Sequence, residues 1–156
     1  MIRDIIIEKL KELKYDVEAD YREGCFTIDI SDLAKEFGIQ FNTGYYILVE
    51  VKEKDDAFIV SIYRYISNEY DALKDLAIEL AKIRGIEFED ESIIWWEEEI
   101  VEEAAKLFDE IALKIINDIT EALQLGEPYH LCWNRSFDVW VAEFMRPKFG
   151  KQGGEA

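Results

Sequence analysis

The chain has few residues of the kinds that cross-link small proteins or carry common catalytic chemistry. Its 156 residues include two cysteines, two prolines and one histidine. Cys25 and Cys132 form no CxxC pair, so we expect two reduced, packed thiols, with one disulfide bridge as the alternative. His130 and Cys132 form an H-x-C pair, but a four-ligand zinc site needs further partners and the chain has no other histidine. We therefore expect these residues to pack, and we find no set of nucleophile, base and orienting group.

Long hydrophobic runs are also missing. No eighteen consecutive apolar residues occur, and Asp4 interrupts the apolar start. We therefore expect neither a membrane span nor a secretory signal, and we expect a cytoplasmic protein. Amide side chains are scarce as well, because four asparagines and three glutamines stand beside twenty-one isoleucines. This bias is typical of proteins from hot environments and indicates a thermophilic source.

Negative charge is abundant and uneven. The net charge is −17, and between Glu87 and Glu110 eleven acidic residues face a single lysine. Affinity for nucleic acid comes largely from lysine and arginine side chains that displace counterions, so this composition makes nucleic acid an unfavourable partner. Residues 1–86 sum to only −6 and the residues from Tyr129 onward sum to +1. A local basic surface is therefore left open.

The hydrophobic pattern predicts one α+β domain over residues 1–149, followed by a mobile tail at residues 150–156. With 49% hydrophobic and 34% charged residues, the composition is that of a folded domain. We expect an antiparallel sheet of hairpins packed by an N-terminal helix, a middle helix and a long helix with an acidic start. The expected helices cover residues 2–15, 31–37, 98–125 and 137–144, the last of them behind Ser136, and a further helix lies between an Asn68 cap and Gly85. The expected hairpins cover residues 17–30 and 45–66. A further pair of short strands is expected at 86–89 and 93–96.

The second expected hairpin has a clear pattern of faces. Ile47 and Val49 lie on one face of its first strand, and Val60 and Ile62 lie on one face of its second strand. A loop with an even number of residues pairs these two apolar sets on the same side of the sheet. We therefore expect that side to face the core.

The start of the long helix follows from its phase. Its apolar residues fall on one broad arc at about 100° per residue. Extending that arc backward places Glu97 in its middle and Trp95 and Trp96 outside it. A helix through Trp95 would bury a carboxylate and expose two tryptophans, which is costly. We therefore expect the helix to begin near Glu98.

Asp29, Glu50 and Lys52 resemble the acidic residues and the lysine of the PD-(D/E)xK nuclease fold. The E-x-K triplet that begins at Glu50 ends a predicted strand, and Asp29 lies on the preceding strand. The resemblance covers residues 1–90 and implies that Asp29 and Glu50 hold Mg²⁺, while Lys52 stabilises charge at the scissile phosphate or orients the attacking water. No proline precedes Asp29, which departs from the motif. The alternative is a solvated strand face, with these side chains as cross-strand partners or edge gatekeepers.

The order helix, hairpin, hairpin, helix, strand pair, long helix resembles the type III secretion chaperone-like fold, also seen in bacterial sensory-transduction regulators. The resemblance covers residues 1–125 and rests on element order and apolar phase. Members are small, acidic, non-enzymatic proteins that dimerise and bind another chain. The resemblance implies a protein-binding adaptor or chaperone-like module that forms a homodimer and uses no cofactor. The expected helices at 31–37 and 137–144 depart from the minimal pattern.

The partner-binding surface is expected where the acidic helix begins. On one strand, Trp95 and Trp96 would point to opposite faces, so one of them can be exposed beside glutamates, a composition suited to an interface. Acidic charge would mainly set the encounter rate and the choice of partner, and buried aromatic side chains would supply affinity. A DNA-mimicking inhibitor is a third possibility that rests on charge alone. The expected contact residues are Trp95, Trp96, Glu98, Glu99, Glu102 and Glu103.

Overall fold

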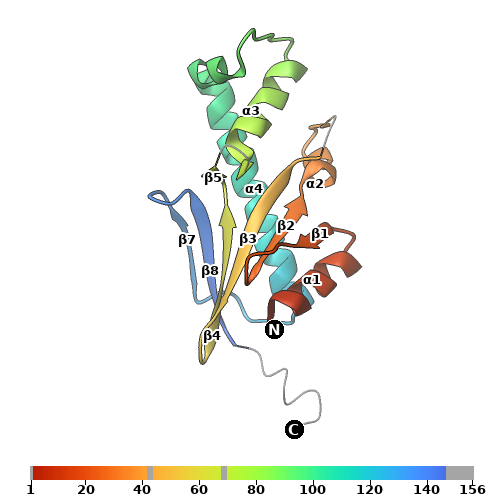
Figure 1. Cartoon of the computed structure of the whole chain (residues 1–156), viewed down its shortest axis with the longest axis vertical. Coiled ribbons are helices and arrows are strands. Elements are labelled where there is room, and N and C mark those ends of the chain that lie inside the picture. Colours follow the sequence, from red (N-terminus) through yellow and green to blue (C-terminus); the bar gives the residue numbers. More distant parts are fainter. Residues whose placement is uncertain (1, 42–43, 68–69, 147–156) are drawn as a thin grey trace.

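The computed structural model describes residues 2–41, 44–67 and 70–146, which form an α+β fold (Figure 1). Its helices are α1 (Ile2–Glu12), α2 (Ser31–Lys35), α3 (Ala72–Ile83), the 3-10 helix η1 (Glu91–Trp96) and α4 (Glu98–Ala122). Its strands are β1 (Asp16–Ala19), β2 (Cys25–Asp29), β3 (Tyr46–Glu53), β4 (Ala57–Tyr63), β5 (Tyr65–Ser67), β6 (Tyr70–Asp71), β7 (His130–Asn134) and β8 (Val139–Met145). Among the described helices, none is both long and apolar enough to cross a membrane.

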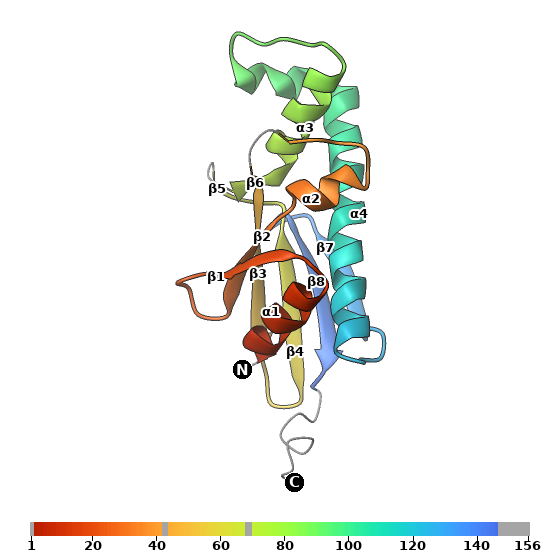
Figure 2. The same ribbon diagram turned by 90° about the vertical axis from the view of Figure 1, so that its right-hand side faces the viewer.

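The main sheet has six antiparallel strands in the order β1-β2-β3-β4-β8-β7. β5 and β6 form a separate two-stranded ribbon. α1 and α4 pack on one face of the main sheet, and no helix of the described chain lies on the other face (Figure 2). We call the first face the covered face and the second the open face.

The core lies between the covered face and the helices. Phe26, Val49 and Ile62 are aligned across neighbouring strands, and all three are fully buried. From α4, Phe108 and Ile111 pack into the same hydrophobic cluster and are also fully buried. The alternation of apolar and polar residues along the strands therefore decides which face the helices cover.

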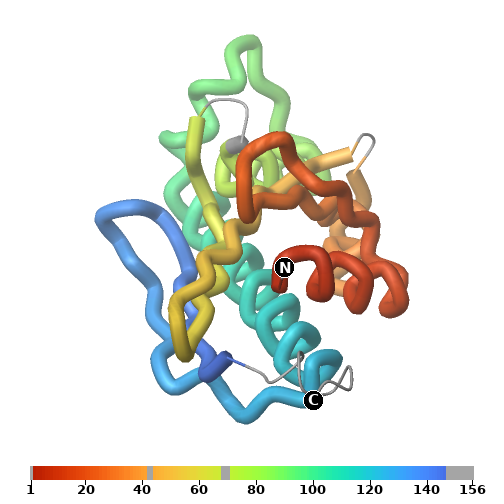
Figure 3. Tube along the Cα trace, turned by 60° about the horizontal axis from the view of Figure 1, so that its bottom comes forward, coloured from red at the N-terminus to blue at the C-terminus, as the bar shows by residue number. Residues whose placement is uncertain are grey.

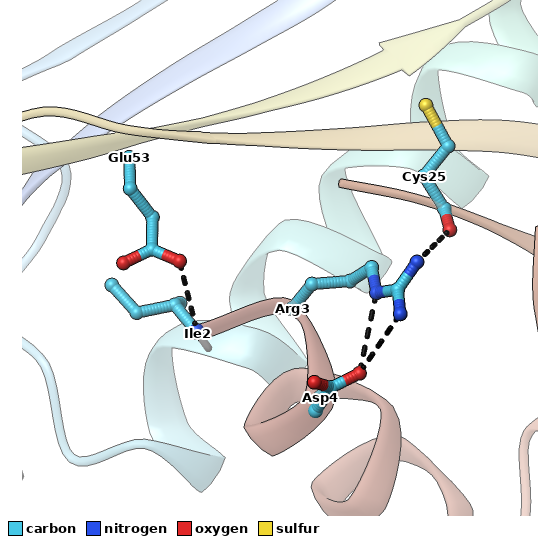
Figure 4. A network of polar contacts seen from close by, with 5 residues as sticks. All are labelled: Ile2, Arg3, Asp4, Cys25 and Glu53. Carbon is cyan, nitrogen blue, oxygen red and sulfur yellow. Dashed lines mark hydrogen bonds and ion pairs between the residues drawn. The ribbon is translucent and has the colours of Figure 1, made fainter. Parts of the chain in front are cut away.

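Polar contacts fix the start of α1 against the sheet (Figure 4). The backbone N–H of Ile2 donates to Glu53 Oε2 at 3.2 Å, which places a carboxylate at the positive end of the helix. Arg3 Nη1 donates to the carbonyl oxygen of Cys25 at 3.2 Å, and the same guanidinium pairs with Asp4. α1 is therefore tied to both β2 and β3.

One end of the molecule is built from helices alone. α4 has 25 residues, about 37 Å at the usual rise per residue, and its first turns extend beyond the sheet to pack against α3 and η1 (Figures 1 and 2). We call α3, η1, the segment between them and residues 98–105 of α4 the head.

Most of the predicted elements are confirmed, including the α+β class, the two N-terminal hairpins and the start of α4 at Glu98. The pairing of Val49 with Ile62 confirms that both apolar strand faces lie on the same side. α3 ends before Gly85, which has a φ of 75°, a left-handed conformation that glycine adopts without steric cost. Asp71 caps α3 by accepting a hydrogen bond from Lys74 N at 3.0 Å, so the prediction of a cap at Asn68 is wrong by three residues. Asn68 itself and the predicted tail at 150–156 lie outside the described residues.

The prediction of strands at 86–89 and 93–96 is wrong. Residues 91–96 form the 3-10 helix η1, and residues 86–90 form no strand. The Asp90 carboxylate accepts a hydrogen bond from Ser92 N at 2.9 Å, which favours a turn at this point over an extended chain. Ile94 is fully buried and anchors η1 in the core.

The prediction of a helix at 137–144 is also wrong. Residues 137–138 lie in the β7–β8 turn, and residues 139–144 belong to β8, which forms a hairpin with β7 and pairs with β4 in the main sheet. Trp140 and Phe144 lie on the covered face, whereas Val141 lies on the open face, so apolar residues occur on both sides of the strand. Apolar residues on both faces of a short strand produce the same spacing as a helix, and the spacing alone does not separate the two.

Candidate functional site

η1 carries two adjacent tryptophans and an isoleucine that are exposed to solvent. Trp96 is 84% exposed, Ile93 is 43% exposed and Trp95 is 42% exposed. In a 3-10 helix, residues three apart lie on the same side, so Ile93 and Trp96 share one side of η1. Ile94 points the other way and is fully buried. We call Ile93, Trp95 and Trp96 the tryptophan surface.

Local hydrogen bonds hold η1 in place. Asp90 caps its start, and the backbone N–H of Glu97 donates to the carbonyl of Ile94 at 2.9 Å at its end. The carbonyl oxygen of Glu97 then accepts from the N–H groups of Ile100 and Val101, which starts α4. Because these contacts and buried Ile94 fix the short helix at both ends, the tryptophan surface is part of the folded scaffold.

Trp95 differs from Trp96 in its surroundings. It lines a groove of about 240 Å³ between the head and the end of the sheet, together with Arg64, Asp71 and Asp138. Arg64 donates to Asp138 at 3.0 Å, and its guanidinium lies over an indole ring of β7 with 4.5 Å to the ring centroid. Trp95 therefore adjoins polar groups that already have partners, whereas Trp96 presents most of its ring to solvent.

Carboxylates surround the tryptophan surface in sequence and in space. Nine acidic residues and no lysine or arginine occur between Glu87 and Glu103. Glu98, Glu99 and Glu102 are exposed on the first turns of α4, where the helix dipole favours negative charge. Glu103 instead forms an ion pair with Arg84 at the end of α3. Glu98, Glu99 and Glu102 are thus the glutamates of these first turns of α4 that are available to a partner.

Asp75 on α3 has a perturbed pKa. Burial, followed by the nearby Asp71 carboxylate, raises the pKa of Asp75 from 3.8 to about 6, with smaller contributions from Glu91 and Glu79 and an opposing one from Lys74. Desolvation penalises the charged form of a carboxylate, and neighbouring carboxylates add to that penalty. The charged form of Asp75 is therefore disfavoured in the folded protein, chiefly by burial.

The structure does not bring the predicted nuclease residues together. Asp29 of β2 pairs with Tyr46 of β3, and Glu50 lies four positions beyond Tyr46 on β3. About 13 Å of strand therefore separates the positions of the two carboxylates. The Asp29 carboxylate accepts from Ser31 N at 2.9 Å and from Ser31 Oγ at 2.5 Å. It thereby provides an acceptor for the first N–H group of α2.

Glu50 and Lys52 both lie on the open face, as their spacing predicted, but they have separate surroundings. Glu50 accepts a hydrogen bond from Tyr63 Oη at 3.2 Å. Burial and the Glu50 carboxylate raise the pKa of Tyr63 to about 12. Lys52 is exposed opposite Ile59. Within the described ranges, no group of three or more histidine, cysteine or acidic side chains is arranged to hold a metal ion.

Both cysteines are free, in agreement with the expected reduced thiols. Cys25 is buried, and burial raises the pKa of its thiol, with a further contribution from Glu50. Cys132 Sγ lies 3.2 Å from His130 Nε2 on the open face of β7. The H-x-C pair is therefore a local contact on an edge strand.

Ile93 and the surroundings of Tyr15 were not predicted as site residues. Ile93 could have been found from its three-residue spacing to Trp96, had the segment been recognised as a 3-10 helix. Tyr15 Oη donates to Asp118 Oδ2 at 2.5 Å beside a cavity of about 420 Å³. These two residues are 103 positions apart, so no local pattern could have paired them.

No protein family model, no curated protein and no solved structure matches this chain. Its function is therefore inferred from the geometry of the head and of the sheet.

Proposed function

We propose that the protein is a non-enzymatic interaction module, an adaptor or chaperone-like protein of the cytoplasm, that binds a basic protein partner through its head. The observation that carries this proposal is the 84% exposure of Trp96 on a short helix whose other side is anchored by Ile94. An exposed tryptophan beside an isoleucine costs solvation free energy that a binding partner recovers by covering it.

The surrounding charges define the partner. Tryptophan is enriched among the residues that dominate interface energies. The exposed carboxylates at the start of α4 add long-range attraction for a positively charged surface. A fitting partner therefore offers an apolar groove for Trp96, bordered by lysine or arginine side chains opposite Glu98, Glu99 and Glu102.

The test uses one aromatic variant and one matched control. Wild type, Trp96→Ser and Phe137→Ser are immobilised and used to isolate basic proteins from extracts of the source cells, and the affinity of each isolated partner is then measured by calorimetry. Phe137 is 69% exposed in the β7–β8 turn, outside the head. We expect Trp96→Ser to raise the Kd at least about 30-fold, the usual effect of losing a dominant interface residue, and Phe137→Ser to leave it unchanged.

A charge variant separates the two contributions. Replacing Glu98, Glu99 and Glu102 with glutamine should slow association and weaken its dependence on salt, with a smaller effect on dissociation. The proposal is wrong if the partners bind Trp96→Ser as tightly as wild type, or if no protein distinguishes wild type from Trp96→Ser.

A further inference from the structure

The outer edge of β7 has no strand partner in the described part of the chain. β7 is the last strand of the six-stranded sheet and pairs only with β8. Figures 1 and 3 show the β7–β8 hairpin at the margin of the molecule, with no other described element beyond it. An unpaired edge presents free N–H and C=O groups and is a template for pairing with another chain.

The two edges of the sheet differ in how they are protected. β1, the opposite edge, carries exposed Asp16 and Glu18 among its four residues, and charged side chains on an edge strand discourage its pairing with another chain. The five residues of β7, His130–Asn134, include no lysine, arginine, aspartate or glutamate, although 34% of the chain is charged. β7 thus lacks the charged side chains that usually prevent edge pairing.

An uncharged surface continues from β7 onto α4. A groove of about 330 Å³ lies between them and has an apolar wall that includes Leu113 and Leu131, which are 37% and 43% exposed. Asn117 and Thr120 continue this lining along α4, and Glu127 is the one charged residue among the lining residues. The edge of β7 and its adjacent groove therefore form one surface with little charge.

We propose that β7 pairs antiparallel with β7 of a second copy of this chain, which continues the main sheet across a twofold axis. All five residues pair only when Cys132 of one copy faces Cys132 of the other. Leu131 then faces Trp133 of the other copy on the covered face, and His130 faces Asn134 on the open face. Each pair joins residues of similar polarity, and no like charges are opposed.

Charge also favours the β7 edge over the acidic head as the site of self-association. Two heads would bring two sets of nine acidic residues together, which repel each other, whereas two β7 edges bring none. An isologous contact at β7 also closes after two copies, because the same edge is used by both. The twofold axis reverses the strand direction, so the two heads lie at opposite ends of the dimer and stay free.

The first test is a cross-link at Cys132. Directly opposed residues of antiparallel strands have Cα atoms about 4.5 to 5.5 Å apart, within the range of a disulfide. Diamide accepts two electrons and two protons from a pair of thiols, which leaves a disulfide between the copies. We expect a disulfide-linked dimer from wild type and from Cys25→Ser, and none from Cys132→Ser. Moving the thiol with Leu131→Cys in the Cys132→Ser background should slow the cross-link at least about tenfold, because residue 131 faces residue 133.

The second test is the oligomeric state measured by sedimentation equilibrium. Leu131→Lys places lysine in both apolar pairs and should weaken dimerisation at least about tenfold. Leu13→Lys is the matched control, since Leu13 is 49% exposed at the end of α1, and it should leave dimerisation unchanged. Asn134→Lys is a second edge variant, and far-UV circular dichroism confirms that each variant is folded.

The inference holds if wild type is a dimer that Leu131→Lys or Asn134→Lys dissociates and if Cys132 carries the cross-link. A wild-type monomer at concentrations well above micromolar would overturn it. So would a dimer that both edge variants leave intact, or a cross-link that forms equally well from residue 131. None of these outcomes depends on the partner of the head.

Discussion

Replacing Asp75 with asparagine is expected to stabilise the protein at neutral pH. The pKa of Asp75 rises from 3.8 to about 6 in the folded protein, which corresponds to up to about 3 kcal/mol against the charged carboxylate. The side chain is partly accessible, so solvent screening reduces this to about 1 to 2 kcal/mol. Asparagine keeps the shape of the side chain and removes the charge, so Asp75→Asn should recover that free energy.

The effect has a defined pH range. Because the folded-state pKa lies above the unfolded value, the protonated group favours the folded state, and its contribution is complete below about pH 4 and lost as the pH rises through about 6. The difference in unfolding free energy between Asp75→Asn and wild type should therefore be small at pH 4 and largest above pH 6.5.

Thermal and urea unfolding at pH 4 and pH 7 measure this difference. At pH 7 we expect Asp75→Asn to raise the Tm by about 3 to 6 °C, given the usual relation between stability and Tm for a chain of this length. Asp55→Asn removes the same charge from the exposed β3–β4 turn and serves as the control. Equal stabilisation by Asp75→Asn at both pH values, or equal stabilisation by Asp55→Asn, would refute the electrostatic reasoning.

Three further substitutions and two comparison variants test the fold, each measured by urea unfolding at pH 7. Gly24→Ala should lower the free energy of unfolding by about 2 kcal/mol or more. Gly24 has a φ of 77°, and a Cβ there would lie 2.6 Å from a carbonyl oxygen of β3. Gly85→Ala should cost about half as much, because Gly85 has a φ of 75° but open space around it. Tyr15→Phe removes the hydrogen bond to α4 and should cost about 1 to 2 kcal/mol, whereas Tyr21→Phe, at an 87% exposed position, should cost less than about 0.5 kcal/mol. Trp140→Phe removes an indole N–H that donates to a carboxylate of α4 at 2.8 Å and should cost about 1 to 2 kcal/mol; a loss no larger than that of Tyr21→Phe would contradict this.

The parts of the fold that the sequence predicted are those with long, one-sided apolar patterns. The arc of α4 extends over 25 residues, long enough for its phase to exclude Trp95 and Trp96 and to place the start at Glu98. The parity of the β3–β4 pairing follows in the same way from two strands with one apolar face each. In both elements many apolar residues lie on one face, so a single exception does not change the predicted orientation.

The errors lie where a short segment has apolar residues on several sides. Residues 93–96 form one turn and a third of another in η1, and residues 139–145 of β8 are apolar on both faces of the sheet. Few positions then distinguish a period of 2 from one of 3 or 3.6. The placement of β8 beside β4 also joins Ala57 to Met145, a contact between distant segments for which the local sequence carries no signal.

The two proposed surfaces both include residues of α4, and the distance between them makes their independence testable. Glu98 in the head and Leu113 in the groove are 15 residues apart on α4, about 22 Å along the axis. A partner on the head and a second copy on β7 therefore cover separate surfaces.

Trp96→Ser should leave sedimentation unchanged, and Leu131→Lys should leave the affinity of a single head unchanged in solution. On a surface that carries many partner molecules, however, Leu131→Lys should dissociate faster than wild type, because a dimer with heads at both ends can hold two partners at once. If Leu131→Lys instead weakens the solution affinity of the single head, the two surfaces are coupled through α4 and the independence inferred from their separation is wrong.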